Sequence, residues 1–88
     1  EVRHLPGHTP GHVVFIDHAS GRAIVGDTLF RRTVGRTDFA YGDSEALIAG
    51  IRRQLLSLPD ETVVLCGHGM PTTIGEERRS NPFLVAGL

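Results

Sequence analysis

The sequence predicts an α/β fold, because strand-like apolar runs alternate with one amphipathic helical segment. Runs rich in β-branched and aromatic residues lie at 13–16 and 23–25, with turn-forming residues between them, which predicts a β-hairpin. Both faces of the first run are apolar, so we expect its strand to be covered on both sides. A helical segment and a third run, at 62–66, then complete a β-α-β pattern. Such a crossover makes its two strands parallel neighbours in one sheet.

Residues 43–58 are predicted to form the crossover helix. Asp43 is a capping residue, and the acidic Glu45 follows it in the first turn, where negative charge stabilises a helix. Pro59 is expected to end the helix. One apolar stripe runs along the segment at helical spacing. It consists of Leu47, Ile51, Leu55 and Leu58.

The remaining elements are predicted to be short. We expect a strand from Val2 to Leu5 and a long loop at 31–43, where neither helical nor strand periodicity is present. A second loop is expected at 67–71, where glycine and proline interrupt the chain. One short helix is predicted over 74–79, entered through residues 72–73, after which the chain trails off.

The composition is that of one small soluble domain or part of a larger one, with 88 residues, a net charge of -1 and 40% hydrophobic residues. The balanced charge indicates neither nucleic acid nor an anionic membrane as a partner, and no apolar run is long enough to cross a bilayer. The single cysteine, Cys66, excludes an internal disulfide framework and favours a cytoplasmic location. A strand-like run follows directly after Glu1, so we expect the first part of the protein to lie upstream of this chain.

The predicted topology brings polar residues from distant parts of the sequence to one edge of the sheet. The hairpin returns the chain so that His8 or His12 lies close to Asp27. Asp27 and His68 follow the carboxyl ends of two parallel strands, which is where α/β sheets bind ligands. Two imidazoles and a carboxylate are good ligands for zinc or iron, so the sequence predicts a metal site at this edge.

Three segments resemble the later metal-binding motifs of the metallo-β-lactamase-fold hydrolases. They are GHTPGH at 7–12, GDTLF at 26–30 and CGHG at 66–69. The resemblance is closest to the glyoxalase II-like (hydroxyacylglutathione hydrolase-like) branch, to which residues 34–38 and 75–83 are also similar. The match covers nearly the whole chain, and the motifs stand in the order that this family uses.

The resemblance implies an αββα sandwich, of which this chain is the carboxyl-terminal half. It implies that His8 is a ligand of a first metal, that Asp27 bridges two metals and that His68 serves the second. One or two Zn²⁺ ions are expected, although this donor set also accepts Fe or Mn. Asp27 would act in catalysis through a metal-bound water that attacks a thioester or related ester.

One departure from the family pattern is large. The family begins its site with His-x-His-x-Asp-His, and this sequence does not contain that motif. We expect the motif upstream of Glu1, so residues 1–88 are predicted to be a partial domain whose partner is its own amino-terminal half. The fragment alone is expected to be inactive. The helical domain that holds glutathione in larger glyoxalase II enzymes is also absent, so the small-molecule substrate is not expected to be a glutathione thioester specifically.

Two rival functions fit the same residues. The first is an iron-dependent sulfur dioxygenase of the same fold, in which histidines and Asp27 hold one iron. The second is a non-catalytic half-domain module that binds a partner or has lost its site. His8, Asp27 and His68 favour an enzyme, whereas the missing motif favours the module.

Roles are also predicted for residues other than the three candidate metal ligands. Arg36 and Tyr41 are candidates for substrate binding, because their loop overhangs the predicted crevice. His12 could support the metal ligands or begin a strand, and the structural role is favoured; Cys66 is expected to fill space in the core. The family resemblance suggests that the charged and polar residues near the carboxyl end tether the tail. These are Arg78, Arg79 and Asn81.

Overall fold

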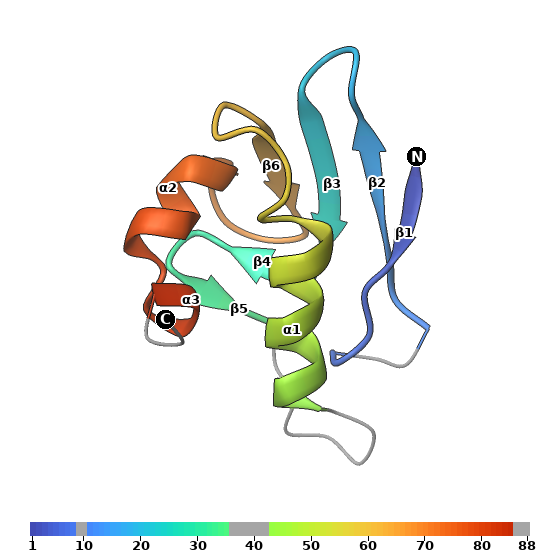
Figure 1. Cartoon of the computed structure of the whole chain (residues 1–88), viewed down its shortest axis with the longest axis vertical. Coiled ribbons are helices and arrows are strands. Elements are labelled where there is room, and N and C mark those ends of the chain that lie inside the picture. Colours follow the sequence, from blue (N-terminus) through green and yellow to red (C-terminus); the bar gives the residue numbers. More distant parts are fainter. Residues whose placement is uncertain (9–10, 36–42, 86–88) are drawn as a thin grey trace.

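A five-stranded sheet forms one layer of the structure, and the helices lie on one side of it (Figure 1). The structure is a computed structural model that describes residues 1–8, 11–35 and 43–85. The strands stand in the order β1-β2-β3-β6-β7, and only β3 and β6 run parallel. Their bounds are Val2–His4 for β1, Val13–Asp17 for β2, Arg22–Gly26 for β3, Val63–Cys66 for β6 and Thr72–Thr73 for β7.

The predicted hairpin and crossover are both confirmed. β2 and β3 pair antiparallel, with Phe15 opposite Ile24. β3 and β6 pair parallel, with Ala23 opposite Val64. The carboxyl ends of β3 and β6 therefore meet at one edge of the sheet, which is the arrangement that the candidate site requires.

Helix α1, Ser44–Gln54, is the predicted crossover helix. The Asp43 side chain caps it by accepting a hydrogen bond from the Ala46 amide (3.0 Å). The helix ends at Gln54, before the expected stop at Pro59, and Leu58 lies in the turns that follow. Leu58 is still buried, because these turns fold it back against the same core.

The predicted loop at 31–43 contains part of a small hairpin that the sequence analysis missed. β4, Leu29–Phe30, pairs antiparallel with β5, Thr33–Val34, across a two-residue turn. Strands of two residues are too short to show an alternating pattern, so they could not be recognised from hydrophobicity. The rest of the predicted loop, residues 36–42, lies outside the described residues.

Residues 72–85 contain more regular structure than predicted. α2, Ile74–Ser80, agrees with the expected short helix, and the Thr73 side chain caps it. Thr72 and Thr73 also form the edge strand β7, which was expected only as the entry to the helix. A further short helix, α3, Pro82–Val85, replaces the expected trailing end.

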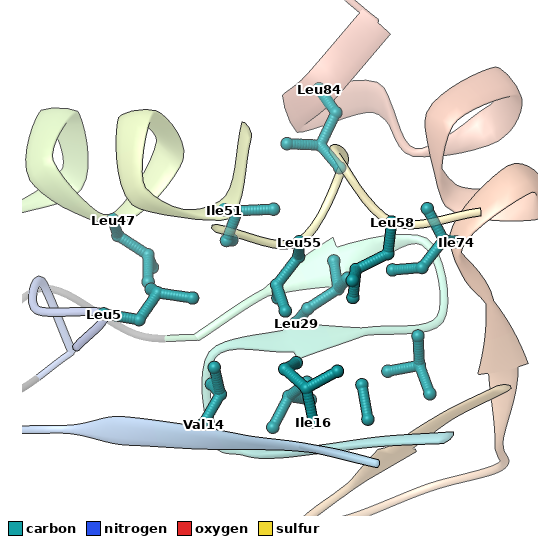
Figure 2. Packing of buried hydrophobic residues seen from close by; sticks show 13 residues of the cluster. Leu5, Val14, Ile16, Leu29, Leu47, Ile51, Leu55, Leu58, Ile74 and Leu84 are labelled. Carbon is teal, nitrogen blue, oxygen red and sulfur yellow. The ribbon is translucent and has the colours of Figure 1, made fainter. Parts of the chain in front are cut away.

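The hydrophobic core lies between α1 and one face of the sheet (Figures 1 and 2). Leu47, Ile51 and Leu55 of the predicted stripe are fully buried and face the sheet, as Figure 2 shows. The other buried apolar residues come from the strands, the loops and the later helices. They are Leu5, Val14, Ile16, Ala23, Val25, Leu29, Leu58, Val64, Ile74 and Leu84.

The opposite face of the sheet is open in this chain, so the expectation that β2 is covered on both sides is wrong for the described structure. Successive strand residues point to opposite faces, and Phe15 and Ile24 therefore point away from α1. Their exposed fractions are 51% and 54%. Val2, on the same face by its pairing with Phe15, is exposed as well. Within the described ranges, none of the helices is both long and apolar enough to span a membrane.

Candidate metal centre

Asp27 lies directly after β3, in a turn that several hydrogen bonds hold in place. The Thr28 hydroxyl donates to the Val25 carbonyl oxygen (2.8 Å). The Gly67 amide donates to the Gly26 carbonyl oxygen (2.9 Å), which joins the turn after β3 to the loop after β6. The backbone therefore fixes the position of the Asp27 carboxylate at the edge of the sheet.

His8 lies in a loop that packs against the start of α1. The Asp43 amide donates to the Gly7 carbonyl oxygen (2.8 Å). Gly7 has a φ of +131°, and a β-carbon there would stand 2.4 Å from the Leu47 β-carbon. Only glycine allows this approach, so the loop that carries His8 is held close to the helix.

The structure brings His8, Asp27 and His68 to the same place, as the topology predicted. His8 Nε2 lies 3.8 Å from Asp27 Oδ2, and His68 Nε2 lies 3.6 Å from Asp27 Oδ1. Each carboxylate oxygen therefore faces a different imidazole. The His8 side chain is 18% exposed and that of His68 is 81% exposed, so His68 stands at the open rim of the site.

The three side chains line one cavity of about 590 Å³. Its other walls come from β4, β5 and the residue after β5, namely Phe30, Thr33, Val34 and Gly35. The ring of Phe30 stacks on the His68 imidazole, with centroids 6.4 Å apart and an angle of 18° between the planes. This wall was not predicted from the sequence, although Phe30 belongs to the GDTLF motif at 26–30.

The three side chains are of the types that bind metal ions, but they do not form a complete set of ligands. Imidazole nitrogens and a carboxylate are the usual ligands of catalytic zinc and of non-haem iron. The side chains stand as two pairs that share Asp27. Across the described part of the chain, no three His, Cys, Asp or Glu side chains are already arranged so that they could hold a metal ion.

His12 and Cys66 make contacts next to the residues of the site. His12 Nε2 lies 3.0 Å from the Val25 carbonyl oxygen, and its ring stands edge-on to that of His8. The Cys66 thiol donates to the carbonyl oxygen of His68 (2.9 Å) and so helps to shape the loop that carries this histidine. The contact adds a loop-shaping role to the core packing that was predicted for Cys66. Arg36 and Tyr41, the candidates for substrate binding, lie outside the described residues.

The fold and this site define a class of protein: an α/β protein with imidazole and carboxylate side chains close together at the carboxyl ends of neighbouring parallel strands. Residues 1–68 match the model of the metallo-beta-lactamase superfamily. The chain therefore belongs to this superfamily, and the fold expected from the resemblance is confirmed.

Three other proteins are similar to this chain over most of its length. Hydroxyacylglutathione hydrolase GloC of Haemophilus influenzae is 57% identical over 84 residues, which cover 96% of this chain and 40% of GloC. The crystal structure of TTHA1623 in a di-iron-bound form is 55% identical, with a TM-score of 0.91 over 96% of this chain and 42% of that one. ETHE1 from Myxococcus xanthus is 40% identical, with a TM-score of 0.86 over 93% and 37% of the two chains. The chain thus spans about 40% of the length of GloC.

Proposed function

We propose that this chain contributes His8, Asp27 and His68 to the metal centre of a hydrolase that acts on a thioester or related ester. The main support is that each oxygen of the Asp27 carboxylate lies near one imidazole nitrogen. Oδ2 is 3.8 Å from His8 Nε2, and Oδ1 is 3.6 Å from His68 Nε2. A carboxylate placed in this way is suited to bridging two cations. The similarity to the hydroxyacylglutathione hydrolase GloC supports a hydrolytic reaction on a thioester.

Some residues of the chain would hold the metal, and others would enclose the substrate. A bound divalent metal supplies Lewis-acid activation of water and of a carbonyl group. Asp27 would hold the centre in place, because backbone hydrogen bonds fix its turn on both sides. Phe30 and Val34 give the cavity apolar walls, which exclude bulk water from one side of a bound acyl group.

The metal is proposed to be zinc, with one or two ions per site, and the rest of the site is proposed to come from residues outside this chain. Three side chains arranged as two pairs do not complete a centre. The uncovered sheet face with Phe15 and Ile24 offers a surface on which the other half of an αββα sandwich would pack. We therefore infer that the fragment alone is inactive and that its partner is an amino-terminal half-domain.

A chimera with GloC tests this proposal. The chain would replace the matching segment of GloC, and release of thiol from a simple thioester would be followed with and without Zn²⁺. We expect zinc-dependent thiol release from the chimera and none from the 88-residue chain alone. Asp27→Asn should lower the rate of the chimera by at least about a hundredfold, as expected when a metal ligand is lost. Asp17→Asn, at the exposed end of β2, is the matched control and should leave the rate unchanged.

Iron-dependent oxidation of a sulfur compound is the second candidate. It is supported by the donor set, which also suits iron, and by the di-iron-bound form of the TTHA1623 structure. Oxygen uptake by the iron-loaded chimera, without thiol release, would favour this reaction over hydrolysis. A chimera that folds and binds metal but performs neither reaction would contradict both candidates and favour the non-catalytic module.

A further inference from the structure

Glu77, in α2, is a charged side chain that is fully buried although it lies outside the metal site. Its Oε1 accepts hydrogen bonds from the Arg32 backbone amide (2.7 Å) and from Asn81 Nδ2 (3.0 Å). Its Oε2 accepts from the Thr72 hydroxyl (2.6 Å) and lies 3.4 Å from the Arg32 guanidinium. A carboxylate buried with this many donors holds several segments in one arrangement.

Arg32, the partner of Glu77, has an unusual backbone conformation. Its φ is 68°, and among the described residues it is the only non-glycine residue with a positive φ. It lies in the two-residue turn that joins β4 to β5. An L-residue with a β-carbon is disfavoured in this left-handed region, so the surrounding structure must hold it there.

The turn matters because its hairpin forms a wall of the metal site. Phe30 of β4 stacks on the His68 imidazole. Asn81 connects the same network to β5, since its Nδ2 donates to the Thr33 carbonyl oxygen (3.0 Å). A continuous set of contacts thus runs from Glu77 through the hairpin to His68, whose side chain is 81% exposed and has few other restraints in the described structure.

We propose that Glu77 is a positioning residue for the metal site. By holding Arg32 in the left-handed conformation it fixes the β4–β5 hairpin, and through Phe30 it orients the imidazole of His68. Only the metal-binding part of the test below depends on the proposed function.

The test uses nuclear Overhauser contacts between the ring protons of Phe30 and His68, measured without metal and well below the unfolding temperature of each variant. Glu77→Ala should weaken or abolish these contacts. Adding Arg32→Gly should restore them, because glycine adopts a φ of 68° without help from Glu77. This recovery separates positioning from a general loss of stability, since Arg32→Gly returns no partner to Thr72 or Asn81.

Glu76→Ala is the matched control. Glu76 pairs with the Arg32 guanidinium (2.6 Å) but receives no hydrogen bond from the Arg32 backbone amide, so its loss should leave the ring contacts unchanged. If Glu77→Ala does not fold, Glu77→Gln takes its place, because glutamine keeps one acceptor oxygen. A partial loss of the contacts, recovered by Arg32→Gly, is then expected.

Zinc binding provides a second readout. In the chimera with GloC, the dissociation constant for Zn²⁺ alone should rise about tenfold in Glu77→Ala and return toward the unsubstituted value in the double variant, as is typical when support of a metal ligand is lost and regained. Unchanged ring contacts in the Glu77 variants, or contacts that Arg32→Gly does not restore, would overturn the positioning role. A chimera that carries the unaltered chain but binds no zinc would contradict the proposed metal site, whereas the ring contacts would still decide the role of Glu77.

Discussion

Gly67 lies so close to Asp27 that a β-carbon at position 67 would stand 2.4 Å from Asp27 Oδ1. Real β-carbons do not approach an oxygen this closely, so any larger residue at 67 must displace the carboxylate. The Gly67 amide also donates to the Gly26 carbonyl oxygen, which ties the loop after β6 to the turn after β3. The absence of a side chain at 67 therefore lets the two loops meet with Asp27 between His8 and His68.

Gly67→Ala, made in the chimera with GloC, should accordingly weaken both metal binding and the fold. We expect the Zn²⁺ dissociation constant to rise by about tenfold or more, because the Asp27 carboxylate must move away from one imidazole. The free energy of unfolding should fall by about 1–3 kcal/mol, as is usual for overpacking. Competition with a chromophoric chelator measures the first quantity and urea denaturation the second.

Gly11→Ala is the control for this substitution. It makes the same chemical change between His8 and His12, but a β-carbon at 11 would have no described atom within 4 Å apart from those of Gly11 and its chain neighbours. Its zinc affinity should equal that of the wild type. Equal affinities for Gly67→Ala and the wild type would show that the close approach to Asp27 has no bearing on the site.

Asp43→Ala should destabilise the protein by about 1 kcal/mol, because it removes the side chain that caps α1. The backbone amide of Asp43, which donates to Gly7, is unaffected by the substitution. Ser44→Ala, one residue further along and exposed, should change the stability by less than about 0.5 kcal/mol. Equilibrium denaturation in urea compares the two, and equal losses would argue against a capping role.

Ile51→Ala should cost about 2–5 kcal/mol, because Ile51 is fully buried between α1 and the sheet. A loss of this size is a large fraction of the stability of a small domain. Arg53→Ala, on the exposed side of the same helix, should have little effect. Circular dichroism during thermal unfolding distinguishes the two variants. A comparable loss in Arg53→Ala would mean that α1 does not pack as described.

Charges on the open sheet face should disrupt the chimera with GloC but not the isolated chain. Phe15→Glu and Ile24→Glu, combined, place charge where the other half of the sandwich is proposed to pack, so the chimera should fold poorly. The isolated chain should lose little stability, since both side chains are already about half exposed there. Soluble yield and urea midpoints of both proteins measure these effects.

Phe83→Glu is the control for the open face, because Phe83 is exposed to a similar degree but belongs to α3. It should be tolerated in the chimera. A chimera that accepts the charges at 15 and 24 without loss would show that this face is not the surface on which the sandwich closes.

Much of the fold follows from hydrophobic patterning. The hairpin of β2 and β3, the stripe on α1 and the parallel pairing of β6 each rest on apolar patterns of three or more residues, which are long enough to be recognised. The convergence of His8, Asp27 and His68 then follows from topology. The hairpin returns the chain to the edge where β2 begins, and residues after neighbouring parallel strands share that edge.

Two kinds of feature were not predicted. They are elements too short to show a hydrophobic period and residues whose role depends on contacts with distant parts of the sequence. β4 and β5 have two residues each, and no pattern marks them. Glu77 lies in a charged segment that would ordinarily face solvent, and only the folded chain shows it buried against Arg32. The open sheet face was mistaken for a covered one, because an apolar strand looks the same whether or not its partner belongs to the chain.

The most direct measurement is a crystal structure of the chimera with GloC soaked in Zn²⁺, with anomalous scattering recorded at the zinc edge. The account predicts anomalous density in the cavity between His8, Asp27 and His68, with Asp27 and at least one imidazole nitrogen about 2.0–2.2 Å from the metal. Zinc bound elsewhere, or a cavity in which these three side chains turn away from one another, would contradict it.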